Sequence, residues 1–341
     1  MLGPPCRWSP IRPQKMARYN RTMCYSAMVE QDLKSLARRF NAQVDYASFE
    51  EMMRRRADGQ AINIGKALEA NFYRPESEGE ARIKKHIDRY QGQVGTKLEA
   101  ALFAQKKRLA DSERTLASKE TKKALEDKRI ASNKIDWHLK KLAALKRTEL
   151  KPSDSRIFPF WYAPLIVMET GKRVIKPMRY HCRPNGKPAS YDKRYDGLYN
   201  ARRDNFEGFW KELFGVRHGV LVATSFFENV SRHAFEKREL EPGEKPQNIV
   251  LHFNPQTGQD MMLACMWDHW SANGEPNLYS FTAITDEPPE EVAAAGHDRC
   301  VIPLTEANLD AWLNPAGLET SELYQLLDDR SRPYYEHELA A

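Results

Sequence analysis

Hydrophobic residues follow two different periodicities along this chain, and the change falls near residue 152. Apolar residues from Val29 to Phe40 recur at helical spacing, which predicts a short amphipathic helix. Ser48 followed by Glu51 is typical of a capping box and predicts that a second helix opens there. The first part of the chain is therefore expected to be helical.

The stretch from about residue 78 to 145 is rich in Ala, Lys, Glu, Arg and Leu and carries one narrow apolar stripe. This pattern predicts one long helix, or two helices folded on each other. A single helix would extend on the order of 100 Å. A break near Ser118 to Thr121, or at Asn133 as an N-cap, would make a hairpin instead. We expect residues 43–150 to form a helical, coiled-coil-like insertion.

After Pro152, short runs rich in Val, Ile, Phe and Tyr alternate with turn residues, as in antiparallel sheets. Helices are expected at 203–214, 289–294 and 305–313. The chain is thus predicted to have an α+β fold, with a mostly antiparallel β domain, flanking helices and the long helical insertion. The predicted strands are Phe158–Met168, Arg173–His181, Gly219–Phe227, Asn248–Phe253, Met261–Met266, Leu278–Ile284 and Cys300–Leu304.

Composition narrows the functional classes. The 341 residues suffice for two domains, or for one domain with an insertion. No apolar run approaches the ~20 residues of a membrane span. Five cysteines without CxxC spacing indicate a reducing compartment, with neither a disulfide framework nor a zinc ribbon. The net charge of +6 is a mild indication of a polyanionic partner. The lysine-rich stretch 119–151 is interpreted as a solvated helical face, with a DNA-contacting arm as the alternative.

The most reactive candidate in the sequence is Cys24, which follows Met23. If Cys24 became the first residue, its amine and thiol would lie on adjacent carbons. An aldehyde would then condense with the amine, and the thiolate would close a five-membered thiazolidine. Residues 1–22 are interpreted as an upstream extension or propeptide absent from the mature protein, with Met23 as the true initiator. The alternative is that Cys24 is an ordinary buried thiol.

Four further motifs carry groups with useful chemistry. Asn200-Ala201-Arg202 offers an amide and a planar guanidinium. Glu228 follows two phenylalanines, where its pKa can be raised, and His297 precedes Arg299 just before a predicted strand. Each of these can also be explained as an ordinary strand end or turn. The fourth motif resembles a stacking platform for single-stranded nucleic acid, since an aromatic ring lies between two arginines: Arg179, Tyr180 and Arg183.

Taken together, these motifs resemble the SOS-response-associated peptidase (SRAP) family of abasic-site processing proteins. The Met-Cys start, an Ala-Pro segment, an aromatic strand ending in Pro, Asn-Ala-Arg, aromatic-Glu and His-x-Arg occur here in the family's order. No single motif is specific, but six in order are. In this sequence they are Met23-Cys24, Ala163-Pro164, Tyr180–Pro184, Asn200-Ala201-Arg202, Phe227-Glu228 and His297-Asp298-Arg299.

The chain departs from the family pattern at several places. Tyr25-Ser26-Ala27 replaces the usual Gly-Arg-Phe, Asp204 closes the Asn-Ala-Arg motif in place of Glu, Ser225 replaces Gly, and Asn229 replaces Trp. The helical block has no counterpart in compact members. The resemblance implies an SRAP-like open barrel, built from residues 23–42 and 151–341.

The resemblance also implies a mechanism, in which the N-terminal cysteine forms a thiazolidine with the aldehyde of an abasic site in single-stranded DNA. It implies a peptidase that exposes Cys24 and lyase-like chemistry on abasic DNA, with no cofactor and no metal. Cys24 would be the nucleophile, Asn200 would orient the opened sugar, and Glu228 and His297 would move protons. The DNA-binding residues would be Arg202, Arg299, Tyr180, Arg179 and Arg183.

Two other functions stay open on sequence grounds. One is a non-covalent module for single-stranded or modified DNA, with the helical insertion as a partner-docking arm. The other is an N-terminal nucleophile amidohydrolase, which the long helical block fits poorly. The expected setting is a cytoplasmic, nucleoid-associated monomer that binds single-stranded DNA with abasic sites, has no membrane contact, and docks a replication or repair protein through the insertion.

Overall fold

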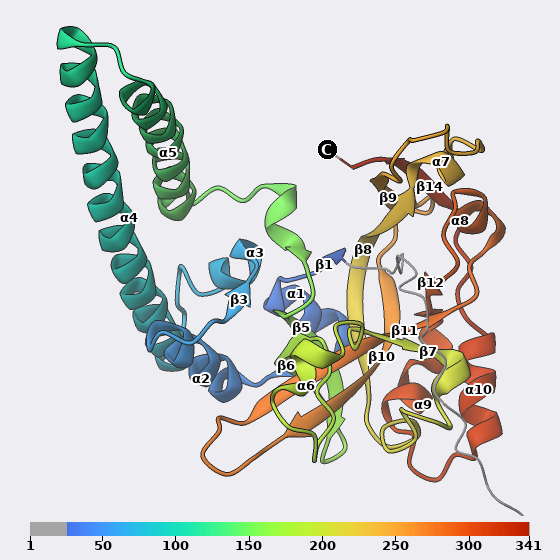
Figure 1. Cartoon of the computed structure of the whole chain (residues 1–341). Helices are drawn as coiled ribbons and strands as arrows, with labels where there is room; N and C mark the ends of the chain where they lie inside the picture. The colour runs from blue at the N-terminus through green and yellow to red at the C-terminus, as the bar shows by residue number, and fades with distance from the viewer. Residues whose placement is uncertain (1–25, 341) are drawn as a thin grey trace, which may run out of the picture.

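Five strands close a barrel at the centre of the molecule. The structure is a computed structural model that describes residues 26–340 (Figure 1). The barrel strands pair in the ring β10-β11-β6-β5-β8, and β8 pairs back to β10. The predicted α+β fold with a barrel-like core is confirmed. The five strands are β5 (Trp161–Glu169), β6 (Lys172–Tyr180), β8 (His218–Ser231), β10 (Met261–Trp270) and β11 (Leu278–Asp286).

Nine shorter strands extend this sheet within the described residues. Most pairs are antiparallel, as predicted, but β6 and β7 each run parallel to β11, β2 runs parallel to β6, and β3 runs parallel to β5. The shorter strands are β1 (Ser26–Val29), β2 (Gln43–Val44), β3 (Asn63–Ile64), β4 (Arg156–Ile157), β7 (Asn200–Arg202), β9 (Asn248–Pro255), β12 (Cys300–Val301), β13 (Pro303–Leu304) and β14 (Tyr335–Leu339).

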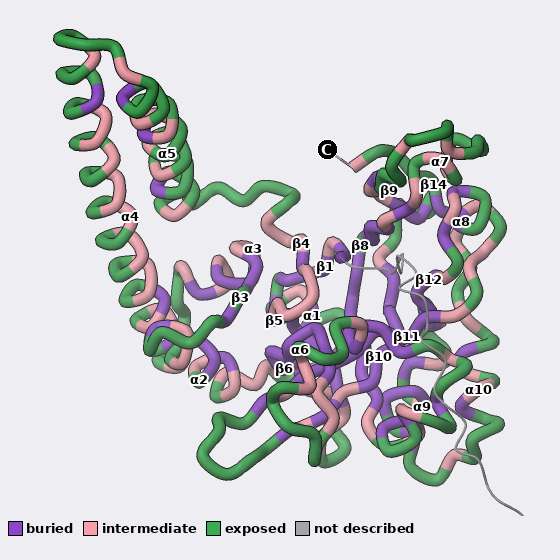
Figure 2. Tube along the Cα trace, viewed as in Figure 1, coloured by how far each residue is buried: buried purple, intermediate pink, exposed green. Residues whose placement is uncertain are grey.

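The alternation of side chains along the strands builds two hydrophobic layers. On β8, Leu221 belongs to a cluster that draws on all five barrel strands, which places it inside the barrel. Its neighbours Val220 and Val222 belong to an outer cluster that packs under helices. Figure 2 shows the buried segments concentrated in the barrel and in the helices that pack around it. The covering helices are α1 (Leu33–Phe40), α2 (Tyr46–Ala57), α3 (Lys66–Ala70), α9 (Leu309–Leu313) and α10 (Thr320–Asp328).

Two long helices form a hairpin that projects from the barrel (Figure 1). These are α4 (Glu78–Ser118) and α5 (Lys122–Lys146). The chain turns at residues 119–121, where the Thr121 side chain caps α5 by accepting from the Ala124 N–H. The predicted break near Ser118 to Thr121 is therefore confirmed. The alternative break at Asn133 is wrong, because that residue lies within α5.

Only α4 and α5 project, while the residues before them lie on the barrel. Strands β2 and β3 add to the edges of β6 and β5. Phe49 on α2 and Leu68 on α3 are fully buried in the outer cluster. The helical hairpin that projects from the globular part therefore begins at Glu78. No helix among residues 26–340 is long and apolar enough to cross a membrane.

Three expectations about helices need correction. Ser48 is not an N-cap; the Asp45 side chain caps α2 by accepting from the Ser48 N–H. Val29 lies in β1, so the first helix starts only at Leu33. The predicted helix 203–214 is a single 3-10 turn, η2 (Arg203–Asn205), followed by turns. Its continuation is lost because the Asn205 side chain bonds the Phe209 N–H and competes with helical pairing.

The remaining helices are short connections. The predicted helix at 289–294 is confirmed as α8 (Glu290–Ala294), and the helix at 305–313 is confirmed as η3 (Glu306–Asn308) running into α9. Three other elements occur in loops: η1 (Pro152–Ser155), α6 (Tyr191–Arg194) and α7 (Arg232–Phe235).

Candidate active site

A bulge in β8 aims Glu228 toward the barrel-interior side. Met28 of β1 pairs with Ser225, but Val29 pairs with Ala223, so Thr224 is an extra residue on β8. Before the bulge, odd-numbered residues such as Ala223 face inward; after it, the even-numbered Phe226 and Val230 do so. One inserted residue exchanges the two faces of a strand. Glu228 consequently lies on the same side as Phe226, and Phe227 faces the other way.

Glu228 meets His297, the two side chains being fully buried. The His297 Nε2 lies 3.0 Å from the Glu228 Oε2. His297 is held in the loop between α8 and β12, where its Nδ1 lies 2.7 Å from the backbone oxygen of Arg299. Gly296 precedes it with φ +93°, a conformation that an L side chain rarely adopts. Glu228 and His297, which the sequence analysis assigned to one candidate site, are therefore in direct contact.

The pair is suited to moving a proton near neutral pH. Burial raises the pKa of Glu228 to about 7, although the hydrogen bond with His297 pulls the other way. Burial lowers the pKa of His297, but the Glu228 carboxylate outweighs this and leaves that pKa raised. Because Nδ1 faces a carbonyl oxygen, it carries a proton. The Nε2 and Oε2 atoms face each other at ion-pair distance, and the two groups titrate as a coupled unit.

Asn200 and Tyr180 form a second polar contact. The Tyr180 hydroxyl donates to the Asn200 Oδ1 over 3.1 Å. On β7, Ala201 packs in the outer cluster, so Asn200 faces the side of the barrel interior. The Tyr180 ring stacks on Phe281 with centroids 5.2 Å apart and is 5% exposed. This corrects the expectation that Tyr180 stacks on a base, since its ring is enclosed and its hydroxyl positions Asn200.

Arg179 and Arg183 do not join this group. Arg179 points to the opposite face of β6 from Tyr180, and its Nη1 lies 2.7 Å from the Asp192 Oδ2. The Arg183 Nε donates to the Asp192 Oδ1 over 3.0 Å. Burial acts to raise the pKa of Asp192, but these two guanidinium groups outweigh it and lower that pKa to about 2. This buried cluster holds the 183–195 loop to β6, and its arginines are not presented as a platform for phosphates.

Of the two other predicted DNA-binding arginines, Arg202 lies at the surface, whereas the Arg299 side chain is as buried as those of Arg179 and Arg183. Arg202 is exposed at the end of β7, and its guanidinium bonds both oxygens of Asp204. Arg299 is two residues after His297, and its Nε lies 3.4 Å from the Asp298 Oδ1. Both follow directly on residues of the site, because Arg202 is two residues after Asn200.

Sequence reasoning missed Arg156, which supports the start of β1. Its Nε and Nη2 donate to the Ser26 Oγ at 3.2 and 3.0 Å. Its guanidinium also lies 3.5 Å from the centre of the Phe227 ring. His252, from β9 on the other side of β8, stacks on the same ring with centroids 4.3 Å apart. No local pattern pointed to Arg156, because β4 is two residues long and its role arises from pairing across β1.

Cys24 lies outside the described residues. The nearest described residue is Ser26, which pairs with Phe227, the residue before Glu228. The described cysteines are Cys182, Cys265 and Cys300; all are buried, and burial raises the pKa of each thiol. They are therefore poor nucleophiles. Within 26–340, no group of three or more His, Cys, Asp or Glu side chains could hold a metal ion.

Two solved structures resemble part of this chain. A solved structure from Bacteroides thetaiotaomicron is 17% identical with a TM-score of 0.43, and covers 55% of this chain and 77% of that one. One from Bordetella bronchiseptica is 15% identical with a TM-score of 0.43, and covers 55% of this chain and 87% of that one.

Curated relatives match a shorter part of the chain. The abasic site processing protein YobE of Bacillus subtilis is 26% identical over 132 residues, which are 38% of this chain and 55% of YobE. The abasic site processing protein YoqW of Bacillus subtilis is 28% identical over 133 residues, which are 38% of this chain and 54% of YoqW. The chain thus spans about half the length of the curated relatives that it matches.

The family model described as SOS response associated peptidase (SRAP) matches residues 114–340. That range exceeds half of the chain and contains Asn200, Glu228 and His297. The chain therefore belongs to the SOS response associated peptidase (SRAP) family.

Proposed function

We propose that this protein captures abasic sites in single-stranded DNA by forming a thiazolidine between Cys24 and the aldehyde of the opened sugar. The observation that carries the proposal is the buried contact between Glu228 and His297, one residue along β8 from the partner of Ser26. The names of the curated relatives, abasic site processing proteins, point to the same substrate.

The geometry of β1 supports Cys24 as the nucleophile. Cys24 is two residues before Ser26, and two residues span at most about 7 Å. Ser26 is fixed twice, by pairing with Phe227 and by the Arg156 guanidinium. A nucleophile at position 24 is thus tethered beside the strand that carries Glu228.

The proposed reaction is a condensation that releases one water. The Cys24 amine adds to the aldehyde carbon, and loss of the hydroxyl as water gives an imine. The Cys24 thiolate then adds to that carbon while the imine nitrogen takes a proton, which closes the ring. Glu228 and His297 supply and receive these protons, and the proton they share is available for the departing hydroxyl. Asn200, fixed by Tyr180, would orient the opened sugar, and Arg202 and Arg299 would contact flanking phosphates.

Cys24 can act in this way only as the first residue. In a chain that starts at Met1, the peptide bond between Met23 and Cys24 must be hydrolysed, and this would be the peptidase reaction. An α-amino group has an ordinary pKa of about 8, so an appreciable fraction of the new amine is neutral at physiological pH.

The test is a crosslinking assay with protein whose first residue is Cys24. It is incubated with a single-stranded oligonucleotide that carries one abasic site and run on a denaturing gel. We expect an adduct whose mass is protein plus DNA minus one water. Cys24→Ala should abolish it, and so should prior borohydride reduction of the abasic aldehyde, which leaves the DNA otherwise intact. An adduct formed by Cys24→Ala, or by protein with an intact Met1 N-terminus, would refute the role of Cys24.

A further inference from the structure

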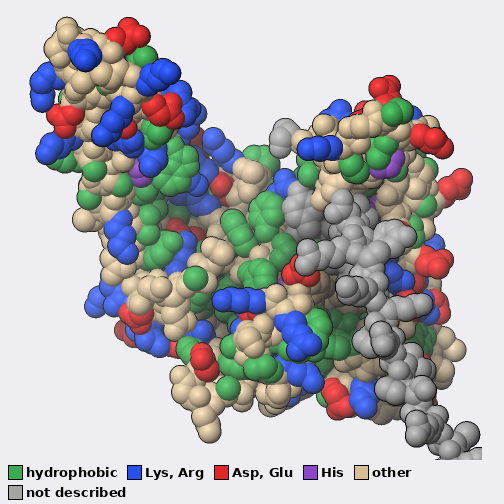
Figure 3. All heavy atoms as spheres, in the orientation of Figure 1, with side chains coloured by type: hydrophobic (Ala, Val, Ile, Leu, Met, Phe, Trp, Pro, Cys, Tyr) green, Lys and Arg blue, Asp and Glu red, His purple; other side chains and the backbone are tan. Residues whose placement is uncertain are grey.

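The helical hairpin has a net positive charge, whereas the rest of the described chain has a net negative charge. Residues 78–147 contain 19 Lys and Arg against 10 Asp and Glu, a net charge of +9. The other described residues, 26–77 and 148–340, contain 29 Lys and Arg against 37 Asp and Glu, a net charge of −8. Figure 3 shows Lys and Arg side chains distributed over the projecting hairpin. This separation of charge indicates that a polyanion meets the hairpin rather than the molecule as a whole.

Many of these cations lack a carboxylate partner. Some charges of the hairpin are paired, for instance Lys128 with Glu113 and Arg129 with Glu126. By contrast, ten lysines between Lys85 and Lys141 have no ion pair with any described residue. They are Lys85, Lys97, Lys106, Lys107, Lys119, Lys122, Lys123, Lys134, Lys140 and Lys141. Unpaired surface cations keep their full attraction for phosphate.

Two exposed aromatic rings occur among these lysines, with the same spacing on both helices. Phe103 on α4 is 73% exposed and precedes Lys106 and Lys107 by three and four residues. Trp137 on α5 is 51% exposed and precedes Lys140 and Lys141 in the same way. Positions three and four apart share a face of a helix. Each ring is thus flanked by two unpaired cations on its own face, and the Lys141 Nζ lies 5.6 Å from the Trp137 ring centre.

The two rings also lie at one level of the hairpin. The ion pairs that join the helices include Arg108 with Asp127 and Glu99 with Lys146. Phe103 is about midway between Arg108 and Glu99 on α4, and Trp137 is about midway between Asp127 and Lys146 on α5. The six residues Phe103, Lys106, Lys107, Trp137, Lys140 and Lys141 are named the mid-hairpin patch.

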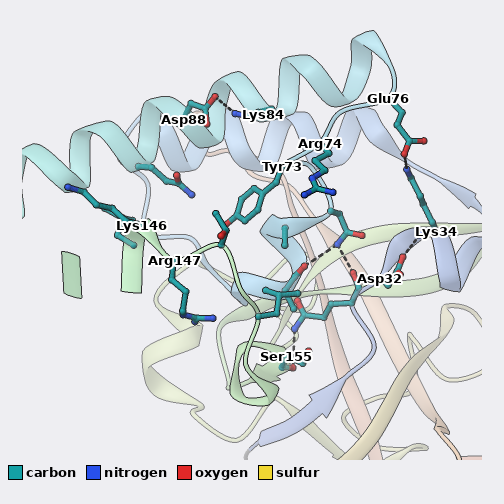
Figure 4. A pocket seen from close by; sticks show the side chains of 18 of the residues that line it. Asp32, Lys34, Tyr73, Arg74, Glu76, Lys84, Asp88, Lys146, Arg147 and Ser155 are labelled. Atoms are coloured by element: carbon teal, nitrogen blue, oxygen red, sulfur yellow. Dashed lines mark hydrogen bonds and ion pairs between the residues drawn. The ribbon is translucent and has the colours of Figure 1, made fainter. Parts of the chain in front are cut away.

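A cavity at the base of the hairpin differs from the mid-hairpin patch in how its charges are paired. It measures about 820 Å³ and is lined by both signs of charge (Figure 4). Its cations are mostly neutralised there: Lys34 lies 2.6 Å from Glu76, and Lys84 lies 2.6 Å from Asp88. This cavity therefore attracts an anion less strongly than the mid-hairpin patch does, where the lysines are unpaired.

We propose that the mid-hairpin patch binds single-stranded nucleic acid, with bases stacking on Phe103 and Trp137 and phosphates held by the four lysines. Aromatic rings interleaved with cations bind single strands without sequence preference, because every base has a π face. A base-paired duplex would use the lysines but offer the rings no open base. The inference extends the proposed function, on which it rests for its biological setting: the strand that carries the lesion would be held at two places.

The hairpin and the candidate active site are directly connected in the chain. The coil after α5 leads through η1 to β4, where Arg156 contacts Ser26 and Phe227. Figure 1 shows the end of α5 and β1 on the same side of the barrel. The chain thus connects the base of the hairpin to the β1 edge of the candidate active site.

The experiment measures binding of undamaged DNA, which needs no crosslinking chemistry. A fluorescein-labelled thymidine oligonucleotide of roughly 20 nucleotides, longer than one typical binding site, is titrated with protein carrying Cys24→Ala. We expect Phe103→Ala with Trp137→Ala to weaken binding by about thirtyfold or more, since stacking on each of the two rings contributes about 1–3 kcal/mol. Changing the four lysines to Gln should make the slope of log K against log salt shallower by about 3.

The matched control is Leu125→Ala with Lys128→Gln and Arg129→Gln. This triplet has the same spacing on α5, but its residue 125 has no ring and both of its cations are ion-paired. It should leave binding within twofold of the parent. Circular dichroism checks that the hairpin stays helical in every variant. A duplex of the same length should lose affinity with the lysine variant and not with the aromatic variant.

Unchanged single-strand affinity in both patch variants would overturn the inference, as expected if the hairpin instead docks an acidic protein. Equal losses for single strand and duplex in the aromatic variant would overturn the stacking. The proposed function fails separately, if the parent with Cys24 first forms no adduct with abasic DNA.

Discussion

The His297 Nε2 and the Glu228 Oε2 lie 3.0 Å apart in a fully buried contact. His297 lies in a loop and Glu228 on a strand, and the two residues are 69 positions apart in the sequence. Burying either charged side chain alone would cost several kilocalories per mole of free energy, because an isolated charge in an apolar environment is strongly disfavoured. Together they form a buried ion pair, and the His297 Nδ1 is satisfied by the Arg299 carbonyl. The contact thus makes a titratable unit that works near neutral pH.

Glu228→Gln should slow adduct formation with abasic single-stranded DNA by about 10²–10⁴-fold, because the amide cannot take or give the shared proton. Affinity for an undamaged strand should change little. Single-turnover rates at saturating protein measure the effect, and His297→Gln should give a loss of similar size. A rate within threefold of the parent would remove the pair from the mechanism.

The part of the stability that Glu228 and His297 contribute should fall as pH rises from 5 to 8. By contrast, His181 and His218, whose pKa values burial lowers to about 4 and about 3, act in the opposite direction. Burial raises the pKa of Glu228 to about 7, and the pKa of His297 is also raised on balance, through Glu228. In that window these two groups, Glu228 and His297, hold more protons in the folded protein than in the unfolded chain, so their contribution to the free energy of unfolding decreases with pH, by up to about 1.4 kcal/mol per unit for each extra proton. Urea titrations of the parent and of Glu228→Gln at several pH values measure this contribution. The stability of the parent relative to Glu228→Gln should decrease as pH rises, and a difference that does not change with pH would contradict the assignment.

Arg156→Lys should reduce adduct formation about tenfold while the fold is retained. Lysine keeps the charge but loses the planar group that both bonds the Ser26 Oγ and stacks on Phe227. Because Arg156 acts by positioning β1, the maximal rate should fall more than the DNA affinity. Arg173→Lys, on an arginine that bonds Phe40 and Asp310 away from β1, is the control. A loss confined to affinity would instead indicate a phosphate contact.

Asp192→Asn should destabilise the protein by about 1–3 kcal/mol at pH 7, because two buried guanidinium groups lose their ionised partner. The pKa of Asp192 is lowered to about 2, so its contribution is present above its unfolded value of about 4 and is lost as pH falls toward 2. Denaturant titration gives the loss, and adduct formation per folded molecule should stay within twofold. If Arg183→Gln removed DNA binding without changing stability, this structural role would be wrong.

Much of the fold could be predicted from local pattern. The short runs rich in Val, Ile, Phe and Tyr after Pro152 located the five barrel strands, and the narrow apolar stripe with a possible break at 118–121 gave the hairpin as one of two alternatives. These features are local because alternation and capping act within a few residues. The order of the motifs also identified Asn200, Glu228 and His297 as candidates, though not how they meet.

Contacts between distant segments were decided only in the tertiary structure. The extra residue Thr224 reverses the faces of β8, and it is recognisable only from the pairing of β8 with β1. The enclosure of Tyr180 by Phe281 depends on the parallel pairing of β6 with β11. Arg179 and Arg183, which the sequence analysis predicted to bind DNA, are bonded to Asp192 instead.

The sequence by itself therefore determined which groups could do chemistry, since side-chain type and order along the chain carry that information. The tertiary structure decided which of them touch, and hence their pKa values, because burial and charge pairing depend on segments that no local pattern connects. Glu228 illustrates both: its place after two phenylalanines made it a candidate, and burial in the tertiary structure raised its pKa to about 7 against the opposing effect of the contact with His297.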